Sequence, residues 1–268
     1  MSVTVYDHPL SPYGQKVKIA LAEKGVGFEA PLPQAIGSGV ASGDFAEASP
    51  RGEVPALVDE DGTRVFDSTV ILEYVEERWP EPPLLPATPA ERARVRMLED
   101  VMDTHFEAIT WGLSEIEYFG RAEGELAERM KATAAKQLAG WFAWLSQELG
   151  DRAWFNGDAF GWGDLAVVPF LNGAAGFGHA PEGALADWLR RANQRDSVSA
   201  CAKAAQGAAS ENSGIGLEQV RGFLEQGLFK REYRDHRLEW MVKSGGLEIV
   251  AAGLEKRNVR FIEPFAEG

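Results

Sequence analysis

The sequence predicts two parts of different fold class, a small α/β domain followed by an all-α helical bundle. Short apolar segments alternate with helical segments over the first eighty residues, as expected of a small sheet covered by helices. A proline-rich stretch at 79–86 then interrupts the pattern. From Pro89 onward, apolar residues recur at spacings of three and four, which is typical of bundle helices. We therefore predict domains at 1–80 and 89–201, a linker at 81–88, and a linker with a helical extension at 202–268.

The first predicted strand and helix meet at a Ser-Pro pair. Val3–Tyr6 is apolar and β-branched, and the helical segment that follows it ends at Gly25. Ser11 is a candidate N-cap, and Pro12 suits the first helical position. The Ser11 hydroxyl would then lie at the positive end of a helix, where an anion or a thiolate is stabilised. The simpler alternative is that Ser11 only caps the helix.

The rest of this domain reads as strand, loop, hairpin and helix. We expect a second strand at 27–32, a loop with one helical turn at 34–48, and a hairpin made of 56–58 and 63–66. Pro55 opens the first hairpin strand, a position that tolerates proline. It is a candidate for the cis isomer, although a trans proline fits the local sequence equally well.

A second acceptor-rich cap, Asp67-Ser68, precedes the helical segment that begins at Thr69. The backbone amides of the first turn and the Ser68 hydroxyl could hold a carboxylate, and Asp67 could hold an ammonium group. Together they suit the head group of an amino acid. Alternatively, both residues only cap the helix.

Three segments carry a resemblance to a known family: SPYGQKVKIALAEKGV, SPRGEVPALVDEDG and VFDSTVILEYVEERWP. In this order and spacing they resemble the thioredoxin-like N-terminal domain of the glutathione transferases. The resemblance implies that Ser11 is the catalytic serine of theta-, zeta- and tau-like members. It also implies that Val54-Pro55 is the cis-proline dipeptide, where the Val54 backbone pairs antiparallel with the cysteinyl part of glutathione. By the same resemblance, Asp67 and Ser68 bind the γ-glutamyl group.

The chain departs from the family just before this dipeptide. Members often have Lys or Gln there, whereas this chain has Glu53, which does not favour the glycyl carboxylate of the tripeptide. We therefore expect weaker glutathione binding, or a basic role for Arg51. Tyr6 and Tyr13 are rival hydroxyl donors; Tyr6 lies within an apolar strand, and Tyr13 is expected to line the site.

The physics of a bound thiol agrees with a serine donor. A free thiol has a pKa near 8.5, so little of it is thiolate at neutral pH. A hydrogen bond to a charged group contributes roughly 1.5–3 kcal/mol, equivalent to about one to two pKa units. The helix dipole adds a few tenths to about one kcal/mol. No metal site and no acid–base triad is expected.

The helical part should supply the pocket for a second substrate. We expect helices at 90–119 and 125–149, and a turn at 154–158. Gly161 and Asp164 form half of the family's capping box, which serves folding rather than chemistry. Candidate pocket residues on the first long helix are His105, Phe106, Trp111 and Tyr118, with Phe119 beside them; the alternative is that these aromatic residues belong to the core.

The C-terminal extension exceeds the usual length of the family. Residues 202–216 read as a flexible linker, 217–241 as an amphipathic helix, 247–254 as a short helix and 259–262 as a strand or arm. Some bacterial glutathione transferases that act on aromatic ethers or thioethers have long C-terminal extensions. We expect this one to pack over the pocket mouth or at the edge of a dimer.

The resemblance implies a cytoplasmic, homodimeric glutathione transferase of the detoxifying kind, with glutathione as cosubstrate and a hydrophobic, aromatic electrophile. Alternatives are a glutathione-dependent lyase, β-etherase or isomerase, or a non-catalytic scaffold with the same fold. The net charge of −14 argues against nucleic acids and anionic membranes. No apolar run is long enough to span a bilayer, and no signal peptide is evident. The single Cys201 fits a reducing compartment.

Overall fold

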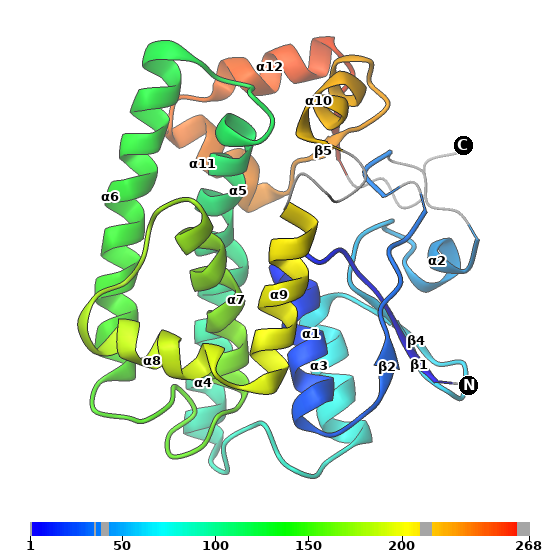
Figure 1. The fold of residues 1–268 in the computed structure, drawn as a ribbon, viewed down its shortest axis with the longest axis vertical. Coiled ribbons are helices and arrows are strands. Elements are labelled where there is room, and N and C mark those ends of the chain that lie inside the picture. Colours follow the sequence, from blue (N-terminus) through cyan, green and yellow to red (C-terminus); the bar gives the residue numbers. More distant parts are fainter. Residues whose placement is uncertain (1, 35, 39–42, 210–215, 262–268) are drawn as a thin grey trace.

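The computed structural model describes residues 2–34, 36–38, 43–209 and 216–261. It divides into an N-terminal α/β domain, a helical bundle and a C-terminal extension (Figure 1). The N-terminal domain contains β1 (Val3–Tyr6), α1 (Pro12–Glu23), β2 (Phe28–Glu29), α2 (Gly43–Ala48), β3 (Ala56–Val58), β4 (Arg64–Phe66) and α3 (Ser68–Arg78). The bundle contains α4 (Pro89–Val101), η1 (Met102–Phe106), α5 (Glu107–Glu117), α6 (Gly124–Leu149), α7 (Trp162–Gly176), α8 (Gly183–Asn193) and α9 (Asp196–Ala209). The extension contains α10 (Leu217–Glu225), β5 (Arg231–Glu232), α11 (Asp235–Lys243), α12 (Leu247–Glu255) and β6 (Val259–Arg260).

The N-terminal sheet has the strand order β2-β1-β3-β4. β1 is parallel to β2 and antiparallel to β3, and β3 is antiparallel to β4. α1 and α3 pack together on one side, where Val3 and Val5 enter the main core. α2 covers the other side, where Phe45 forms a smaller cluster with Tyr6 and Phe66. This is the thioredoxin-like arrangement that the sequence predicts.

The strand directions place three segments at one edge of the sheet. β1 ends at this edge and leads to Ser11; β3 begins there, directly after Pro55; and β4 ends there and leads to Asp67. The three motifs predicted to bind one ligand are therefore brought to one edge by the topology alone.

Local chemistry explains why α1 begins and ends where it does. The Ser11 side chain caps its first turn, and Pro12 occupies the first helical position. At its C-terminal end Gly25 adopts a φ of 69°, a conformation that glycine tolerates without steric cost. Both boundaries were predicted from the sequence.

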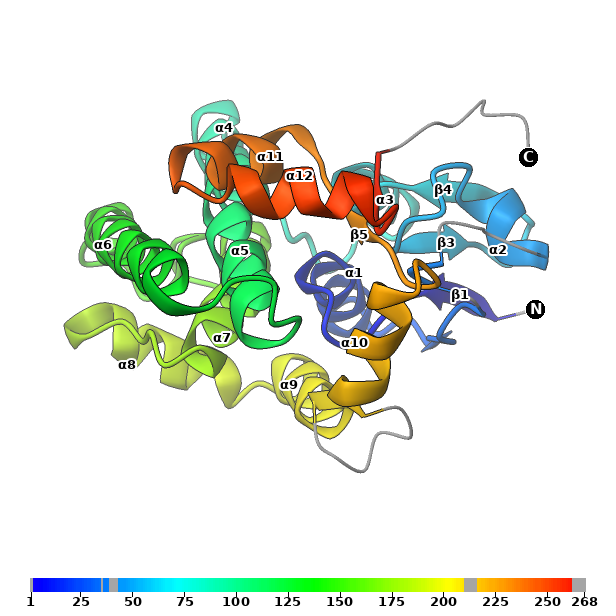
Figure 2. The ribbon, with the colours of Figure 1, turned by 90° about the horizontal axis from the view of Figure 1, so that it is seen from above.

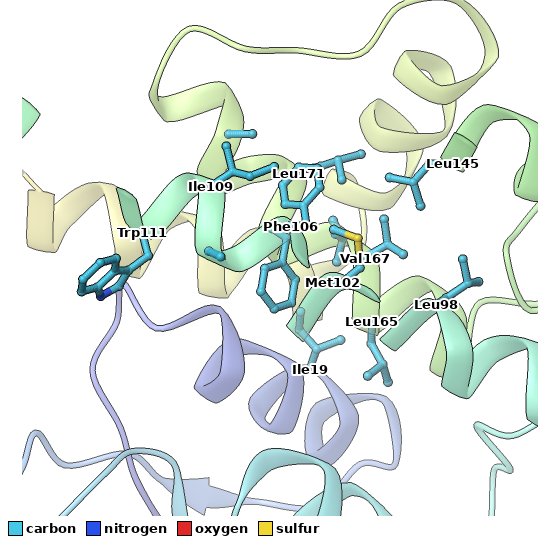
Figure 3. Packing of buried hydrophobic residues seen from close by; sticks show 14 of the residues in the cluster. Ile19, Leu98, Met102, Phe106, Ile109, Trp111, Leu145, Leu165, Val167 and Leu171 are labelled. Atoms are coloured by element: carbon cyan, nitrogen blue, oxygen red, sulfur yellow. The ribbon is translucent and has the colours of Figure 1, made fainter. Parts of the chain in front are cut away.

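The bundle core lies directly against α1. α7 packs against α1, α4 and α5, and it is buried along almost its whole length. Figure 3 shows Ile19 of α1 pointing toward Met102, Phe106 and Leu165 of the bundle. The predicted helix at 90–119 is one helical run, but a π-helical turn at 102–106 separates α4 from α5.

The buried half of the predicted capping box is present at the start of α7. Asp164 is fully buried, and its Oδ2 accepts a hydrogen bond from the Gly161 amide at 3.1 Å. Its Oδ1 accepts from the Phe155 amide and from the Trp188 indole, each at 2.8 Å. Asp164 therefore joins the turn at 154–158 to α7 and α8, which agrees with a role in folding.

Three predicted elements differ in the structure. The strand at 27–32 is only two residues long, because pairing with β1 is limited to Phe28 and Glu29. Residues 202–209 of the predicted linker are helical, since α9 continues through an alanine-rich sequence with a high helix propensity. The single helix predicted at 217–241 is interrupted after α10, where Gly227 adopts a φ of 69° and the chain turns into β5. Residues 39–42 of the predicted loop, 210–215 of the linker and Ile262 lie outside the described residues.

The extension crosses from the bundle to the N-terminal domain. α11 packs against α5, and α12 runs beside it toward the N-terminal domain (Figure 2). β5 and β6 form a two-stranded parallel sheet. Among the described helices, none has the length and apolarity needed to cross a bilayer.

Candidate functional site

Ser11 has a donor hydrogen that its capping role does not use. Its Oγ accepts a hydrogen bond from the Gly14 amide at 3.2 Å, and its backbone has the extended conformation of an N-cap. A serine hydroxyl has one donor hydrogen and two acceptor positions, so capping leaves the hydrogen for another partner. Ser11 is half-buried at the N-terminus of α1, where the helix dipole favours an anion. The arrangement can therefore donate a hydrogen bond to a thiolate.

The two rival tyrosines are engaged elsewhere. Tyr13 donates its hydroxyl hydrogen to the backbone oxygen of Asp103 at 2.7 Å, and its ring packs edge-on against Phe170. Burial and the nearby Glu107 carboxylate raise the pKa of Tyr13 well above its ordinary value. Tyr6 lies against Phe45 on the opposite side of the sheet from α1. Neither hydroxyl is therefore placed to donate to a ligand beside Ser11.

Val54 and Pro55 form the edge at which an extended peptide could pair. The peptide bond between them is cis. Val54 is half-buried, and its backbone forms no hydrogen bond with any residue that the structure describes. Pro55 is buried next to the first residue of β3. The backbone of Val54 is thus available to an added strand.

Asp67 and Ser68 lie at the start of α3. Asp67 has a φ of 77°, which is uncommon for a residue other than glycine. Its Oδ1 accepts from the Thr69 amide at 3.1 Å and from the Val70 amide at 3.4 Å. Its Oδ2 lies 3.5 Å from the Arg51 guanidinium. Ser68 is buried at the first helical position. One Asp67 oxygen therefore caps the helix, and the other faces Arg51 with only a long contact.

Glu53 faces the extension rather than solvent. Its carboxyl group lies 3.6 Å from the Arg234 guanidinium and 3.9 Å from that of Arg51. It also hydrogen-bonds to Glu232 of β5. Burial, this hydrogen bond and the charge on Glu232 raise the pKa of Glu53 to about 8. At neutral pH Glu53 is therefore mostly an uncharged carboxylic acid, which is similar in shape and hydrogen bonding to a glutamine.

The extension also covers one side of α5. Glu107, Trp111 and Glu115 are spaced four residues apart, so they share one side of this helix. Arg237 pairs with Glu107 at 2.6 Å, and Tyr233 packs edge-on against Trp111 with ring centroids 4.7 Å apart. The Glu115 carboxylate, which is fully buried, pairs with Arg231 and with Arg121. Two buried carboxylates of α5 thus receive cations from other segments.

A buried network fixes α1 and α3 against the bundle. Lys16 Nζ contacts Glu99 at 2.8 Å and Asp103 at 2.6 Å. The second Glu99 oxygen accepts from the Trp162 indole at 2.6 Å, and Thr69 Oγ1 donates to the first at 2.9 Å. The helix that carries Ser11 and the helix that follows Asp67 therefore share one carboxylate as an anchor.

Comparison with known proteins identifies this arrangement. Residues 10–78 match the glutathione S-transferase N-terminal domain, and residues 101–196 match the glutathione S-transferase C-terminal domain. The chain is 32% identical to a stringent starvation protein A homolog of Coxiella burnetii, over 63% of this chain and 74% of that protein. The chain belongs to the glutathione S-transferase family.

Two further glutathione S-transferase family relatives have names or titles that state more. The maleylacetoacetate isomerase of Pseudomonas aeruginosa is 31% identical over 66% of this chain and 83% of that protein. The crystal structure of rice GST1 in complex with glutathione aligns with a TM-score of 0.61 and 28% identity, over 83% of this chain and 94% of that one. The family thus includes a protein named for isomerisation and, in the starvation protein, one whose name states no reaction.

Within this family fold, the glutathione-binding residues predicted from the sequence meet at one edge. Arg51 bridges toward Asp67 and Glu53, and the cis dipeptide Val54-Pro55 lies between them in the chain. Tyr13 is adjacent in sequence but its hydroxyl points to the bundle. These placements agree with the predicted roles of the group; Tyr13 is the exception, because its hydroxyl already has a partner.

The predicted second-substrate residues do not form one surface. Phe106 is fully buried against Phe142, so it belongs to the core, and the exposed His105 ring stacks on Trp141. Trp111 is covered by Tyr233 of the extension. Tyr118 packs against Phe177, and Phe119 stacks on Phe229 of the extension. An open groove of about 860 Å³ lies elsewhere, lined by residues that include Lys18, Ala22, Arg195 and Cys201.

The sequence reasoning missed the extension residues that meet this edge. They are Glu232, Arg234 and Arg260, which approach Glu53 and the backbone of residues 51 and 52. The available signal was a run of cations in an acidic protein: Lys230, Arg231, Arg234 and Arg237 recur within eight residues.

Proposed function

We propose that the protein is a glutathione transferase in which Ser11 stabilises the thiolate of bound glutathione for attack on a hydrophobic, aromatic electrophile. The observation that carries the proposal is the convergence of three features at one sheet edge. These are the unused hydroxyl hydrogen of Ser11, the open backbone beside the cis Val54-Pro55 bond, and the Asp67-Ser68 cap. Rice GST1, which resembles this chain over most of its length, was solved in complex with glutathione.

Each group of the tripeptide has a matching feature in this arrangement. The Val54 backbone pairs with the cysteinyl part, as an added strand would. The backbone amides at the start of α3 and the Ser68 hydroxyl receive the γ-glutamyl carboxylate, and the free oxygen of Asp67 accepts from its ammonium group. The cysteinyl sulfur then lies toward Ser11.

The Ser11 hydroxyl supplies the chemistry. A hydrogen bond from its hydroxyl to the sulfur favours the ionised form by roughly 1.5–3 kcal/mol, and the N-terminus of α1 adds up to about 1 kcal/mol. These contributions lower a thiol pKa of 8.5 by about one to two units, so a large fraction is thiolate near pH 7. The thiolate attacks the electrophile, and the departing group leaves with the bonding electrons.

Glutathione-dependent isomerisation is a second candidate. It is favoured by the similarity to the maleylacetoacetate isomerase, which covers two thirds of this chain. The same thiolate would add to an unsaturated substrate and leave again after bond rotation, so Ser11 serves both reactions. The homodimer and the cytoplasmic location expected of the family belong to this proposal and are checked by sedimentation and by fractionation.

Ligand binding and turnover test the proposal together. We expect glutathione to raise the melting temperature of the purified protein, because a ligand that binds only the native state stabilises it. We expect a Ser11→Ala variant to bind glutathione with a similar Kd and to lose most of its conjugating rate with an aromatic halide. Glutathione that neither binds nor stabilises the protein would exclude both enzyme functions and favour a non-catalytic member of the family.

A further inference from the structure

The extension is attached to the loop that carries Glu53. Arg260 donates to the backbone oxygens of Arg51 and Gly52 at 3.5 Å and 3.4 Å. Its guanidinium also pairs with Glu232 on the neighbouring strand. On the other side of the loop, the Lys230 amide donates to the Gly37 carbonyl at 2.7 Å. Residues more than 190 positions apart in sequence thus form one surface beside the cis dipeptide.

The direction of peptide pairing indicates which end of glutathione meets this surface. A peptide that pairs antiparallel with Val54 runs opposite to the chain, so its C-terminal residue lies toward Glu53 and its N-terminal residue toward β3. This step rests on the function proposed above. The glycyl carboxylate, which is the C-terminal charge of the tripeptide, then lies on the side where the extension is attached.

Arg234 has the chemistry and the accessibility to bind that carboxylate. It is the N-cap residue of α11, and its guanidinium lies 3.6 Å from Glu53. About a third of its side chain is exposed, in contrast to Arg237, which is 12% exposed and is held by Glu107 and Glu232. Arg51 faces two carboxylates, Glu53 and Asp67. Arg234 is therefore the cation at this edge with the fewest close partners among the described residues.

The charge of the extension agrees with this role. Residues 217–261 contain nine Lys or Arg and seven Asp or Glu, so they are net positive in a protein whose formal charge is −14. The arginine fork of Arg234 suits a carboxylate, which it can bind through two parallel hydrogen bonds.

We propose that Arg234 of the C-terminal extension binds the glycyl carboxylate of glutathione. The extension is then part of the glutathione site, and it supplies the cation that the position before Val54 lacks. Arg260 and Glu232 are positioning residues that keep Arg234 beside the loop.

Binding of two thiols that differ only in the glycyl residue isolates this contact. We would measure the Kd of glutathione and of γ-glutamylcysteine, which lacks the glycine, by titration calorimetry with the full-length protein. We expect Arg234→Ala to weaken glutathione binding roughly tenfold, in line with the loss of one charged hydrogen-bonding partner at a part-exposed site. The Kd of γ-glutamylcysteine should change less than twofold, and Arg234→Lys should restore part of the glutathione affinity. Lys243→Ala removes an exposed cation from the other end of α11 and serves as the matched control, with no change for either thiol.

The outcomes separate this proposal from the proposed function. Equal weakening of both thiols by Arg234→Ala would overturn the assignment, because the loss would then be independent of the glycyl carboxylate. Unchanged binding of both thiols in that variant would also overturn it, and glutathione binding to the wild type would remain. If the wild type bound neither thiol, the proposed function itself would fail.

Discussion

Arg237 of α11 and Glu107 of α5 form a buried ion pair between the extension and the bundle, with Nη2 and Oε1 2.6 Å apart. The charge of Arg237 and hydrogen bonds from Arg237 and His236 lower the pKa of Glu107 to about 2, against the effect of its burial. Removal of one partner of a buried pair leaves an uncompensated charge, which costs about 3–5 kcal/mol. We expect Arg237→Ala to lower the free energy of unfolding by about 3 kcal/mol in urea titrations at pH 7.

The same pair predicts a pH dependence. The pKa of Glu107 is lower in the folded protein than its unfolded value of 4.5, so its stabilisation is present above pH 4.5 and is lost as the pH falls toward 2. The difference in stability between the wild type and Arg237→Ala should therefore shrink over this range. Lys243→Ala should change stability by less than about 0.5 kcal/mol throughout. A constant difference between pH 7 and pH 3 would contradict the assignment.

Glu53 and Glu232 predict the opposite dependence at higher pH. The folded protein holds a proton on Glu53 up to a pKa of about 8, whereas the unfolded chain releases it near 4.5. Folding therefore takes up a proton in this range, and stability should fall as the pH rises from 4.5 to 8. Glu53→Gln retains the shape without the acid, so its stability should fall less over the same range. Identical pH profiles for the variant and the wild type in thermal unfolding would show that Glu53 is ionised at neutral pH.

Gly112 of α5 predicts how closely α11 must approach. A Cβ atom on Gly112 would lie 2.0 Å from the Trp240 ring, so the indole must move to admit it. We expect Gly112→Ala to destabilise the protein by about 1–3 kcal/mol and to speed proteolytic cleavage within residues 217–261. The matched control is Gly140→Ala in α6, where a Cβ meets no atom within 4 Å and the higher helix propensity of alanine should stabilise by about 0.5–1 kcal/mol. Equal effects of the two substitutions would mean that α11 does not depend on this contact.

Tyr13 provides a test of which hydroxyl acts on the thiol. Its hydroxyl donates to the Asp103 carbonyl, so Tyr13→Phe should cost about 1 kcal/mol of stability and leave the conjugating rate within about twofold of the wild type. The measurement is steady-state kinetics with saturating glutathione beside urea unfolding. A large loss of rate with little loss of stability would assign the donor role to Tyr13.

Much of the N-terminal domain could be predicted because its signals are local. Ser11, Pro12 and Gly25 bound α1 through the chemistry of one helix, and Asp67 caps α3 through the amides two and three residues ahead. The cis bond before Pro55 was expected only from the resemblance, because the local sequence allows either isomer.

The extension could not be predicted in the same way because its partners are far away in sequence. Arg237 meets Glu107 across 130 residues, and Tyr233 meets Glu115 across 118. Periodicity suggested one helix through this region, yet the pairing of β5 with β6 interrupts it. The aromatic residues predicted to line a pocket failed for a related reason: helical spacing does not distinguish a core side, such as that of Phe106, from a pocket side.

The pKa of the bound glutathione thiol tests the central claim most directly. It can be measured by following thiolate absorbance against pH with the wild type and with Ser11→Ala, each saturated with glutathione. We expect a pKa about one to two units below 8.5 in the wild type and a return to about 8.5 in the variant. The same lowered pKa in both proteins would contradict the account, because the hydroxyl of Ser11 would then contribute nothing to thiolate formation.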